Sequence, residues 1–211
     1  MDKREAISMS VIRRLPRYYR FLCDLLDSGI IRISSKELAN RMGLTASQIR
    51  QDLNCFGGFG QQGYGYSVKN LKEQISSILG LDSKYKAILI GAGNLGKAVA
   101  SHMCFNDRGF ELIGIFDNNP SLIGTNINNL PVIDVKEIAT FCSKHKPVMS
   151  ILCVPKHVVD ELSDELYSLG IKSYWNFSHY DLSMKYDDVI VENVHLSDSL
   201  MTLCYRIKEN S

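Results

Sequence analysis

The glycines of Gly91-Ala92-Gly93-Asn94-Leu95-Gly96 are the residues of this 211-residue chain whose type and spacing best predict chemistry. They follow an apolar stretch over 87–90 that predicts a strand, and they open a predicted helix. In that position the first glycine allows a tight turn, the second lets the backbone approach a pyrophosphate, and the third lets the helix pack on the strand. The N–H groups and dipole at the helix start favour an anion. The stretch therefore predicts a dinucleotide site.

A carboxylate follows the glycines at the distance that such a site requires. Asp117 ends a second apolar stretch over 110–116, 21 residues after Gly96. A carboxylate there accepts hydrogen bonds from the adenosine ribose and repels a 2′-phosphate, so we predict NAD(H) and not NADP(H). Pro155 ends a further predicted strand and is expected to line the site near the nicotinamide. A glycine turn without a ligand is the alternative. The predicted cofactor-binding residues are Gly91, Ala92, Gly93, Asn94, Leu95, Gly96, Asp117 and Pro155.

Strand and helix patterns alternate over the rest of this region. The predicted helices cover 135–145 and 158–169, and the predicted strands cover 148–154, 171–177 and 188–194. Such alternation implies a mostly parallel sheet with its ligand at the carboxyl ends of the strands. We therefore predict a Rossmann-type NAD(H)-binding domain over 83–194.

The end of the chain predicts an amphipathic helix over 197–208. Leu200, Leu203, Cys204 and Ile207 share one face of it. Because little of the domain is left to cover this face, we expect residues 195–211 to form a dimerisation helix that docks on a partner subunit. Packing on its own sheet is the alternative from the pattern alone.

The first 82 residues predict a second, helical domain. An amphipathic pattern over 7–27 is interrupted by Pro16, which predicts a kink or a helix start. Two capping boxes, Ser34 to Glu37 and Thr45 to Gln48, then begin short helices joined by a turn at Gly43. Two short helices with a tight glycine turn are typical of a helix-turn-helix.

The segment over 56–66 alternates aromatic residues with glycines and predicts a β-hairpin. A hairpin directly after a recognition helix is the wing of a winged helix, and its glycines allow a close approach to a phosphate backbone. A helix over 68–79 then leads into the second domain. The alternatives are a helix-turn-helix that only packs and a hairpin whose aromatic residues only cap the core.

The charges of the two regions differ in sign. Residues 1–82 carry 12 Lys and Arg against 8 Asp and Glu, a net charge of +4, and residues 83–211 carry 12 against 15, a net charge of −3. A basic first domain favours double-stranded DNA as its partner, with a solvated helix face as the alternative. Gln and Asn pair with adenine edges, and Arg with guanine or phosphate. The predicted DNA-binding residues are Arg14, Arg17, Thr45, Ser47, Gln48, Arg50, Gln51, Asn54, Gly60 and Gln61.

Several function classes are disfavoured by composition. No apolar run approaches the length of a membrane span and no signal-peptide pattern begins the chain, so we expect a soluble, cytoplasmic protein. The six cysteines are scattered without a C-x-x-C pair, which disfavours a metal site or disulfide framework. The histidines lie outside any catalytic motif, and the dinucleotide fold leaves little chain for a substrate domain. We therefore predict a regulator without catalytic residues and without a bound metal.

The whole chain resembles the Rex family of redox-sensing transcriptional repressors. The segments that carry the resemblance are Arg14-Leu15-Pro16-Arg17-Tyr18-Tyr19-Arg20, Ser34-Ser35-Lys36-Glu37-Leu38-Ala39, Gln48-Ile49-Arg50-Gln51-Asp52-Leu53, Phe56-Gly57-Gly58-Phe59-Gly60, the stretch from Gly91 to Gly96, Asn176-Phe177 and Val191-Glu192-Asn193-Val194. The resemblance implies a homodimer that binds a palindromic operator and represses genes of fermentation and anaerobic respiration. It also implies release of the DNA by NADH but not by NAD⁺, and a C-terminal helix swapped between subunits.

The sequence departs from this family at two positions. The family usually carries Tyr where His102 stands and Asp where His195 stands, and there these two residues act with an arginine that matches Arg20. Two imidazoles cannot neutralise a guanidinium. The departure predicts a weakened, altered or pH-dependent response to NADH as an alternative to the full family behaviour.

Two other classes stay open. A small NAD-dependent oxidoreductase would show turnover, and a ligand-independent DNA-binding protein would show no stabilisation by a dinucleotide. Measurement of DNA affinity with NAD⁺ and NADH added separately distinguishes all of these hypotheses.

Overall fold

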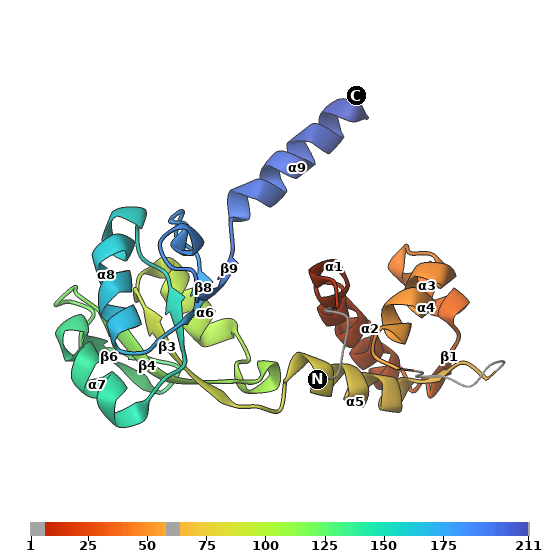
Figure 1. Ribbon diagram of the computed structural model, residues 1–211, viewed down its shortest axis with the longest axis horizontal. Coiled ribbons are helices and arrows are strands. Elements are labelled where there is room, and N and C mark those ends of the chain that lie inside the picture. The colour runs from red at the N-terminus through yellow and green to blue at the C-terminus, as the bar shows by residue number, and fades with distance from the viewer. Residues whose placement is uncertain (1–6, 58–63, 211) are drawn as a thin grey trace. The chain divides into compact units, whose positions relative to one another are not determined.

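The computed structural model describes residues 7–57 and 64–210 of the chain. The chain divides into two compact units, Met1–Asp82 and Ser83–Ser211, which we call unit 1 and unit 2 (Figure 1). Unit 1 is built around one buried hydrophobic cluster, and unit 2 has a cluster on each face of its sheet. Each unit therefore carries its own core.

Unit 1 is mainly helical. Its elements are α1 (Met9–Ile12), α2 (Leu15–Asp27), β1 (Arg32–Ile33), α3 (Ser35–Met42), α4 (Ala46–Asn54), β2 (Tyr66–Ser67) and α5 (Val68–Leu79). The predicted caps are confirmed, because the side chains of Ser34 and Thr45 accept hydrogen bonds from the backbone N–H groups of Glu37 and Gln48, each at 3.1 Å. Gly43 ends α3 in the left-handed conformation, which sets the turn into α4. The helix-turn-helix is thus formed by α3 and α4.

The helix predicted over 7–27 is two helices in the structure. α1 ends at Ile12, and α2 begins at Leu15 with Pro16 in its first turn. Proline is tolerated there because the first N–H groups of a helix have no intrahelical acceptor. Pro16 therefore marks a helix start, which is one of the two outcomes that its position predicted.

Most of the hairpin predicted over 56–66 lies outside the described residues, and its described C-terminal end leads into β2. β2 pairs antiparallel with β1, which precedes α3, and the register places Arg32 opposite Ser67 and Ile33 opposite Tyr66. A β-strand partner for β2 therefore comes from before the helix-turn-helix, and the short stretch over 32–33 gave too weak a strand pattern to predict it. Gly60 and Gln61 lie outside the described residues.

Unit 2 is an α/β layer structure. Its elements are β3 (Tyr85–Ile90), α6 (Asn94–His102), η1 (Asn106–Arg108), β4 (Phe110–Asp117), β5 (Asn126–Ile127), β6 (Leu130–Asp134), η2 (Val135–Glu137), α7 (Ile138–His145), β7 (Met149–Leu152), α8 (Lys156–Ser168), β8 (Ser173–Asn176), η3 (Leu182–Met184), β9 (Ile190–Asn193) and α9 (Leu196–Glu209). Its described strands form one sheet in the order β5-β6-β4-β3-β7-β8-β9. Among these described strands, β5 pairs antiparallel with β6 and all other neighbours are parallel.

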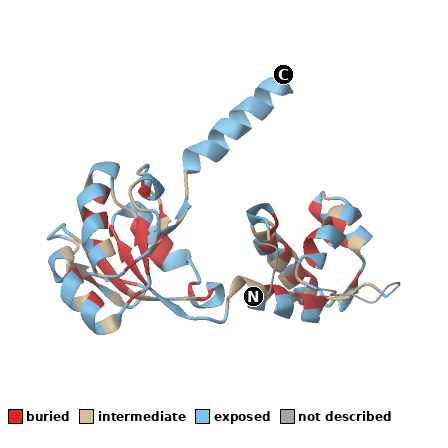
Figure 2. Ribbon diagram, in the orientation of Figure 1, coloured by how far each residue is buried: buried red, intermediate tan, exposed pale blue. Residues whose placement is uncertain are grey.

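The central strand β3 is buried on both faces. Ala87 and Leu89 pack with α6 on one side of the sheet, and Ile88 and Ile90 pack with α7 and α8 on the other. Residues 87–90 are therefore continuously apolar and do not alternate with polar residues, whereas Tyr85 and Lys86 at the start of β3 are exposed. Figure 2 shows the buried residues concentrated in the strands of this sheet. The carboxyl ends of β3, β4 and β7 consequently meet beside the glycine turn.

One sheet edge was not predicted. β5 and β6 form a tight hairpin in which Ile127 pairs with Leu130. Its two turn residues, Asn128 and Asn129, have φ of 50° and 64°. Asparagine tolerates this left-handed conformation, and two such residues suit the turn of a two-residue hairpin. The Asn-Asn pair was therefore the available sequence signal for it.

The C-terminal helix α9 buries none of its residues (Figure 2). Leu200 is 67% exposed and Leu203 is 51% exposed, although both lie on its apolar face. The alternative that this helix packs on its own sheet is therefore contradicted. In the described residues, no helix has the length and apolar content to cross a membrane.

Candidate functional site

The glycine turn between β3 and α6 lies against the end of β7. Gly91 has a φ of +98°, and its N–H donates to the carbonyl oxygen of Phe116 at 2.8 Å. A Cβ atom on Gly91 would lie 2.5 Å from the carbonyl oxygen of Cys153, and one on Gly96 would lie 1.8 Å from that of Gly91. Neither position has room for a side chain, so both glycines are fixed by the protein's own packing.

Gly93 is different, because nothing lies within 4 Å of a Cβ built there. It is the N-cap of α6, and no side chain caps this helix. The exposed Asn94 and Leu95 form its first turn. Since protein packing does not require a glycine at 93, the open space and the uncapped N–H groups fit an anionic ligand such as a pyrophosphate.

Asp117 joins the end of β4 to this turn. One carboxylate oxygen of Asp117 accepts from the N–H of Ala92 at 2.6 Å, and the other accepts from the N–H of Asn119 at 2.8 Å. Each carboxylate oxygen can accept a further hydrogen bond. The carboxylate therefore lies beside the glycines, as its spacing predicted, and its binding of ribose hydroxyls stays a prediction.

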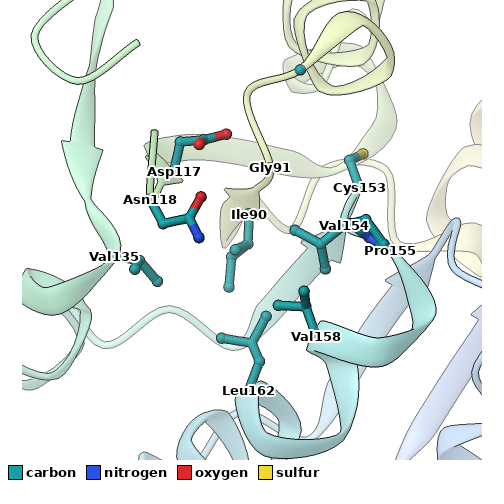
Figure 3. Close-up of a pocket in the computed structure, with 11 residues that line it drawn as sticks. Ile90, Gly91, Asp117, Asn118, Val135, Cys153, Val154, Pro155, Val158 and Leu162 are labelled. Carbon is teal, nitrogen blue, oxygen red and sulfur yellow. The ribbon is translucent and has the colours of Figure 1, made fainter. Parts of the chain in front are cut away.

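A pocket of about 240 Å³ opens next to Asp117 (Figure 3). Gly91, Gly93, Asp117 and Pro155 line it, so the structure brings four of the predicted cofactor residues together. Cys153 and Val154, which precede Pro155 in the segment expected to line the site, line it as well, whereas sequence reasoning missed Ile90, Asn118, Val135, Val158 and Leu162. Val158 and Leu162 are four apart on α8, and helical periodicity after the predicted strand could have indicated them.

The pocket offers an apolar wall opposite a polar one. Figure 3 shows Val158 and Leu162 across the pocket from Asp117 and Asn118, and Val135 beside Asn118. Burial raises the pKa of Cys153 to about 12, so the thiol is protonated and uncharged at neutral pH. A neutral thiol is a poor nucleophile. The lining therefore suits a planar, partly polar ligand group and supplies no activated cysteine.

Two histidines meet where β9 leads into α9. The rings of His179 and His195 are stacked, with centroids 5.1 Å apart and planes 8° from parallel. His195 is the N-cap residue of α9, and its Nδ1 atom is buried without a hydrogen-bond partner among the described residues. In the described part of the chain, no cluster of three or more His, Cys, Asp or Glu is arranged to hold a metal ion.

The outer face of α4 is polar and exposed. Ser47, Arg50, Gln51 and Asn54 lie on it together with Cys55, around a shallow depression. The guanidinium of Arg50 donates to the hydroxyl of Ser35 at 3.1 Å. Amide, hydroxyl and guanidinium groups on one helix face are those that read base edges in a major groove. The structure thus gathers four of the predicted DNA-binding residues on one surface.

The inner face of α4 carries a buried carboxylate that sequence reasoning missed. Asp52 has no exposed surface. It accepts hydrogen bonds from Nε and Nη2 of Arg14 at 2.7 Å each, from the hydroxyl of Tyr18 at 2.7 Å and from the side-chain amide of Gln48 at 2.8 Å. Two predicted DNA-binding residues, Arg14 and Gln48, therefore direct these donors at Asp52.

Arg17 also has contacts within unit 1. Its guanidinium donates to the carbonyl oxygen of Met42 at the end of α3 and lies over the ring of Phe21, 5.8 Å from the centroid. Thr45 caps α4 with its hydroxyl. The Arg17 guanidinium thus reaches from α2 to the end of α3, and Thr45 lies at the start of α4.

Two family models match the chain. The model described as the N-terminus of a putative DNA-binding protein matches residues 6–54, and the model described as a CoA binding domain matches residues 82–180. The matched ranges fall in unit 1 and unit 2 respectively, with the second starting one residue before the boundary.

The curated relatives are more specific. The redox-sensing transcriptional repressor Rex of Thermoanaerobacter sp. (strain X514) is 54% identical over 99% of this chain and 93% of its own length. Rex of Caldanaerobacter subterraneus subsp. tengcongensis is 56% identical over the same shares. The chain belongs to the Rex family. Rex proteins are described as transcriptional repressors, so the family is regulatory.

Solved Rex-family structures agree along the whole chain. RSP in complex with β-NAD⁺ and operator DNA has a TM-score of 0.89 and 54% identity, and covers 97% of this chain and 94% of its own. RSP in complex with β-NADH has a TM-score of 0.88 and 51% identity, with coverage of 97% and 96%. The predicted fold class, an N-terminal winged helix followed by a Rossmann-type domain, is confirmed.

The two glycines of α6 provide a matched pair of variants. Gly93→Ala fits the protein, so we expect unchanged folding, whereas the added methyl occupies the space where a pyrophosphate would lie. NADH affinity should fall roughly ten-fold or more, as measured by titration calorimetry. Gly96→Ala clashes with backbone and should lower the free energy of unfolding by about 3 kcal/mol or more. Trp175, the only tryptophan and part of β8, reports that unfolding. Unchanged NADH affinity of Gly93→Ala would contradict the assigned site.

Acid should weaken unit 1 through Asp52. Burial alone would raise the pKa of Asp52, but hydrogen bonds from Arg14, Tyr18 and Gln48 outweigh it and hold the pKa below its usual value of about 4. The stabilisation is complete above that value and is lost as pH falls through the lower, folded pKa. Asp52→Asn should therefore be less stable at neutral pH and lose less stability on acidification.

Far-UV circular dichroism during urea unfolding checks this, because unit 1 is mainly helical. Trp175 fluorescence serves as the internal reference in unit 2, and Asp27→Asn, at an exposed carboxylate, is the control. An acid sensitivity of Asp52→Asn equal to that of the parent chain would contradict the assignment.

Proposed function

We propose that this chain is a DNA-binding transcriptional repressor that senses the NADH/NAD⁺ state, with NADH binding releasing the operator. The observation that carries the proposal is the pairing, in one chain, of an exposed polar recognition helix with a glycine turn and Asp117. The relatives support it, since RSP is described both with β-NAD⁺ and operator DNA and with β-NADH.

The dinucleotide is held by the turn between β3 and α6. The N–H groups after Gly93 receive the pyrophosphate, and Asp117 receives the ribose hydroxyls of the adenosine half. Val135, Val158 and Leu162 provide the apolar wall for a flat base. The carboxylate repels a 2′-phosphate, so NAD(H) is favoured over NADP(H). When bound, the nicotinamide supplies two redox states that differ by one hydride and one charge. Ala92, Asn94, Leu95, Gly96 and Pro155 shape this site.

Double-stranded DNA is bound by unit 1. Ser47, Arg50, Gln51 and Asn54 on α4 are placed to read base edges in the major groove. Thr45, Arg17, Gly60 and Gln61 are assigned contacts around this helix and in the wing. Residues 1–82 thus act as the DNA-binding domain and residues 83–194 as the NAD(H)-binding domain.

A second copy of this chain is the partner of α9. A helix of this length is marginal alone in water, and its stability normally comes from burying an apolar face. Leu196, Leu200, Leu203 and Ile207 are all more than half exposed here. We assign residues 195–211 to dimerisation, and a dimer matches a palindromic operator through its own two-fold symmetry.

The chain acts as a regulator in the cytoplasm and not as an enzyme. The protonated thiol of Cys153 and the absence of a recognisable acid-base arrangement among the described pocket residues favour this reading. A small NAD-dependent oxidoreductase stays the alternative, and turnover would identify it.

A second candidate is a repressor with a weakened NADH response. His195 at the start of α9, whose ring stacks on that of His179, favours it, because the family usually carries an aspartate at this position and an imidazole cannot neutralise a guanidinium as a carboxylate does. The two candidates share the same DNA and cofactor sites.

The deciding experiment measures operator binding with each cofactor form. A palindromic duplex is first selected from a random DNA library with the full chain. We expect NADH, but not NAD⁺, to lower its affinity by ten-fold or more, since full switching needs about 10⁴-fold differential binding. Scrambled duplex is the control. The same titration at about pH 6 and about pH 8 separates the candidates, because only the second candidate shows a weak or pH-dependent release. Failure to select any sequence would contradict the proposed function.

The helix α9 is tested by placing one charge on either face. Leu200→Asp puts a carboxylate on the apolar face and should give monomers in sedimentation analysis at micromolar concentration. Thr202→Asp puts the same charge on the opposite face and should leave the dimer intact. A dimeric Leu200→Asp variant would remove α9 from the interface.

A further inference from the structure

The buried carboxylate of Asp52 has a position that the proposed contacts with DNA do not explain. It lies on the recognition helix α4, yet it faces inward and has no exposed surface. Its partners are Arg14 at the start of α2, Tyr18 one turn later and Gln48 on α4 itself. The cluster therefore joins the first turns of α2 to the middle of the helix that faces the DNA.

The geometry of the cluster fixes the rotation of α4. Arg14 binds both carboxylate oxygens through two parallel N–H donors, a planar arrangement that defines direction as well as distance. Gln48 and Asp52 are four apart and lie on one ridge of the helix, while Ser47, Gln51 and Asn54 lie on the outer face. A rotation of α4 that displaced the outer residues would break these hydrogen bonds.

The same geometry separates two roles among the residues first expected to touch DNA. Arg14 is only 30% exposed, and its Nε and Nη2 donors are directed at Asp52. The amide donor of Gln48 is directed there as well. An apolar group of the same size often stabilises a fold as well as a buried ion pair does, so stability alone gives no reason for this cluster.

We propose that Asp52 is a positioning residue for operator recognition, and that Arg14 and Gln48 influence DNA binding through Asp52 and not by contacting DNA. The inference rests on the proposed function, since it takes α4 as the recognition helix. Ser47, Arg50, Gln51 and Asn54 are then left as the contact residues of α4.

Substitutions at Arg14 distinguish positioning from contact. Arg14→Lys keeps the positive charge but lacks the planar guanidinium with its two parallel donors. It can therefore replace Arg14 in a contact with phosphate but not in the bidentate hydrogen bond to Asp52. We expect Arg14→Lys, Arg14→Met and Asp52→Asn each to lose roughly ten-fold or more in affinity for the selected operator, about the worth of one good base contact. The double variant Arg14→Met with Asp52→Asn should lose little more than either one alone.

Salt dependence distinguishes positioning from a phosphate contact, and the preference for operator over scrambled duplex is the readout that a purely structural role would not move. Loss of a phosphate contact lowers the slope of log K against log salt by about 1. We expect the slope to stay unchanged for Arg14→Met and the ratio of operator to scrambled-duplex affinity to fall. Arg50→Met, on the outer face, is the matched contact variant, and Asp27→Asn is the inert carboxylate control.

Gln48→Met keeps the proposal testable if the buried variants unfold. Gln48 is partly exposed, and its loss should lower affinity for all operator sequences without changing base preference. Helical circular dichroism and NADH affinity should match the parent chain. A lower salt slope for Arg14→Met, rescue by Arg14→Lys, or relaxed preference at one base pair for Gln48→Met would overturn the proposal. Loss of specific binding by the parent chain would instead overturn the proposed function.

Discussion

The sensing unit depends on one close approach, in which the backbone between β3 and α6 turns against the carbonyl of Cys153 at the end of β7. A Cβ atom at Gly91 would lie 2.5 Å from the Cys153 oxygen, and a Cβ atom at Gly96 would lie 1.8 Å from the Gly91 oxygen. Only glycines therefore allow this close approach. The approach brings Asp117, at the end of β4, within 2.6 Å of the N–H of Ala92. Sheet, helix start and carboxylate therefore form one site because two residues lack side chains.

In unit 1, by contrast, a buried charged side chain, Asp52, determines the orientation of the helix α4. Asp52 is completely buried, and burial alone would favour its neutral form, yet the donors of Arg14, Tyr18 and Gln48 keep its pKa low. Removing one donor would leave a buried charge without its partner, which costs more than the missing bond itself. The outer face of α4 is thus held by contacts that never reach the solvent-facing surface.

Sequence patterns predicted the features that depend on neighbouring residues in the chain. They missed the features that depend on contacts between distant segments. The caps at Ser34 and Thr45, the glycine turn and Asp117 all follow short-range rules, and the structure has each of them. The pairing of β1 with β2 joins residues more than thirty positions apart through two residues each, which leaves almost no periodic signal. Asp52 was missed because a carboxylate on a short polar helix looks solvated until α2 is packed against it.

The assigned cofactor site and the assigned DNA-binding surface lie in different units, which limits how NADH binding can change DNA affinity. The assigned cofactor residues lie in residues 83–211 and the assigned DNA residues in residues 1–82, so the proposed switch has to connect two units that each have their own core. A ligand shifts an equilibrium only by its differential affinity for two arrangements. Converting a population of dimers from nearly all able to bind DNA to nearly all unable needs about 5.5 kcal/mol of differential binding free energy. Each of two cofactor sites then contributes about half of that free energy. In the proposed dimer, two recognition helices must match two half-sites at once, so a change in their separation would release DNA with α4 itself unaltered. A rigidly oriented α4 favours this mechanism. A helix that was free to rotate could keep its base contacts when the helix separation changed, and the NADH-dependent loss of DNA affinity would then be smaller.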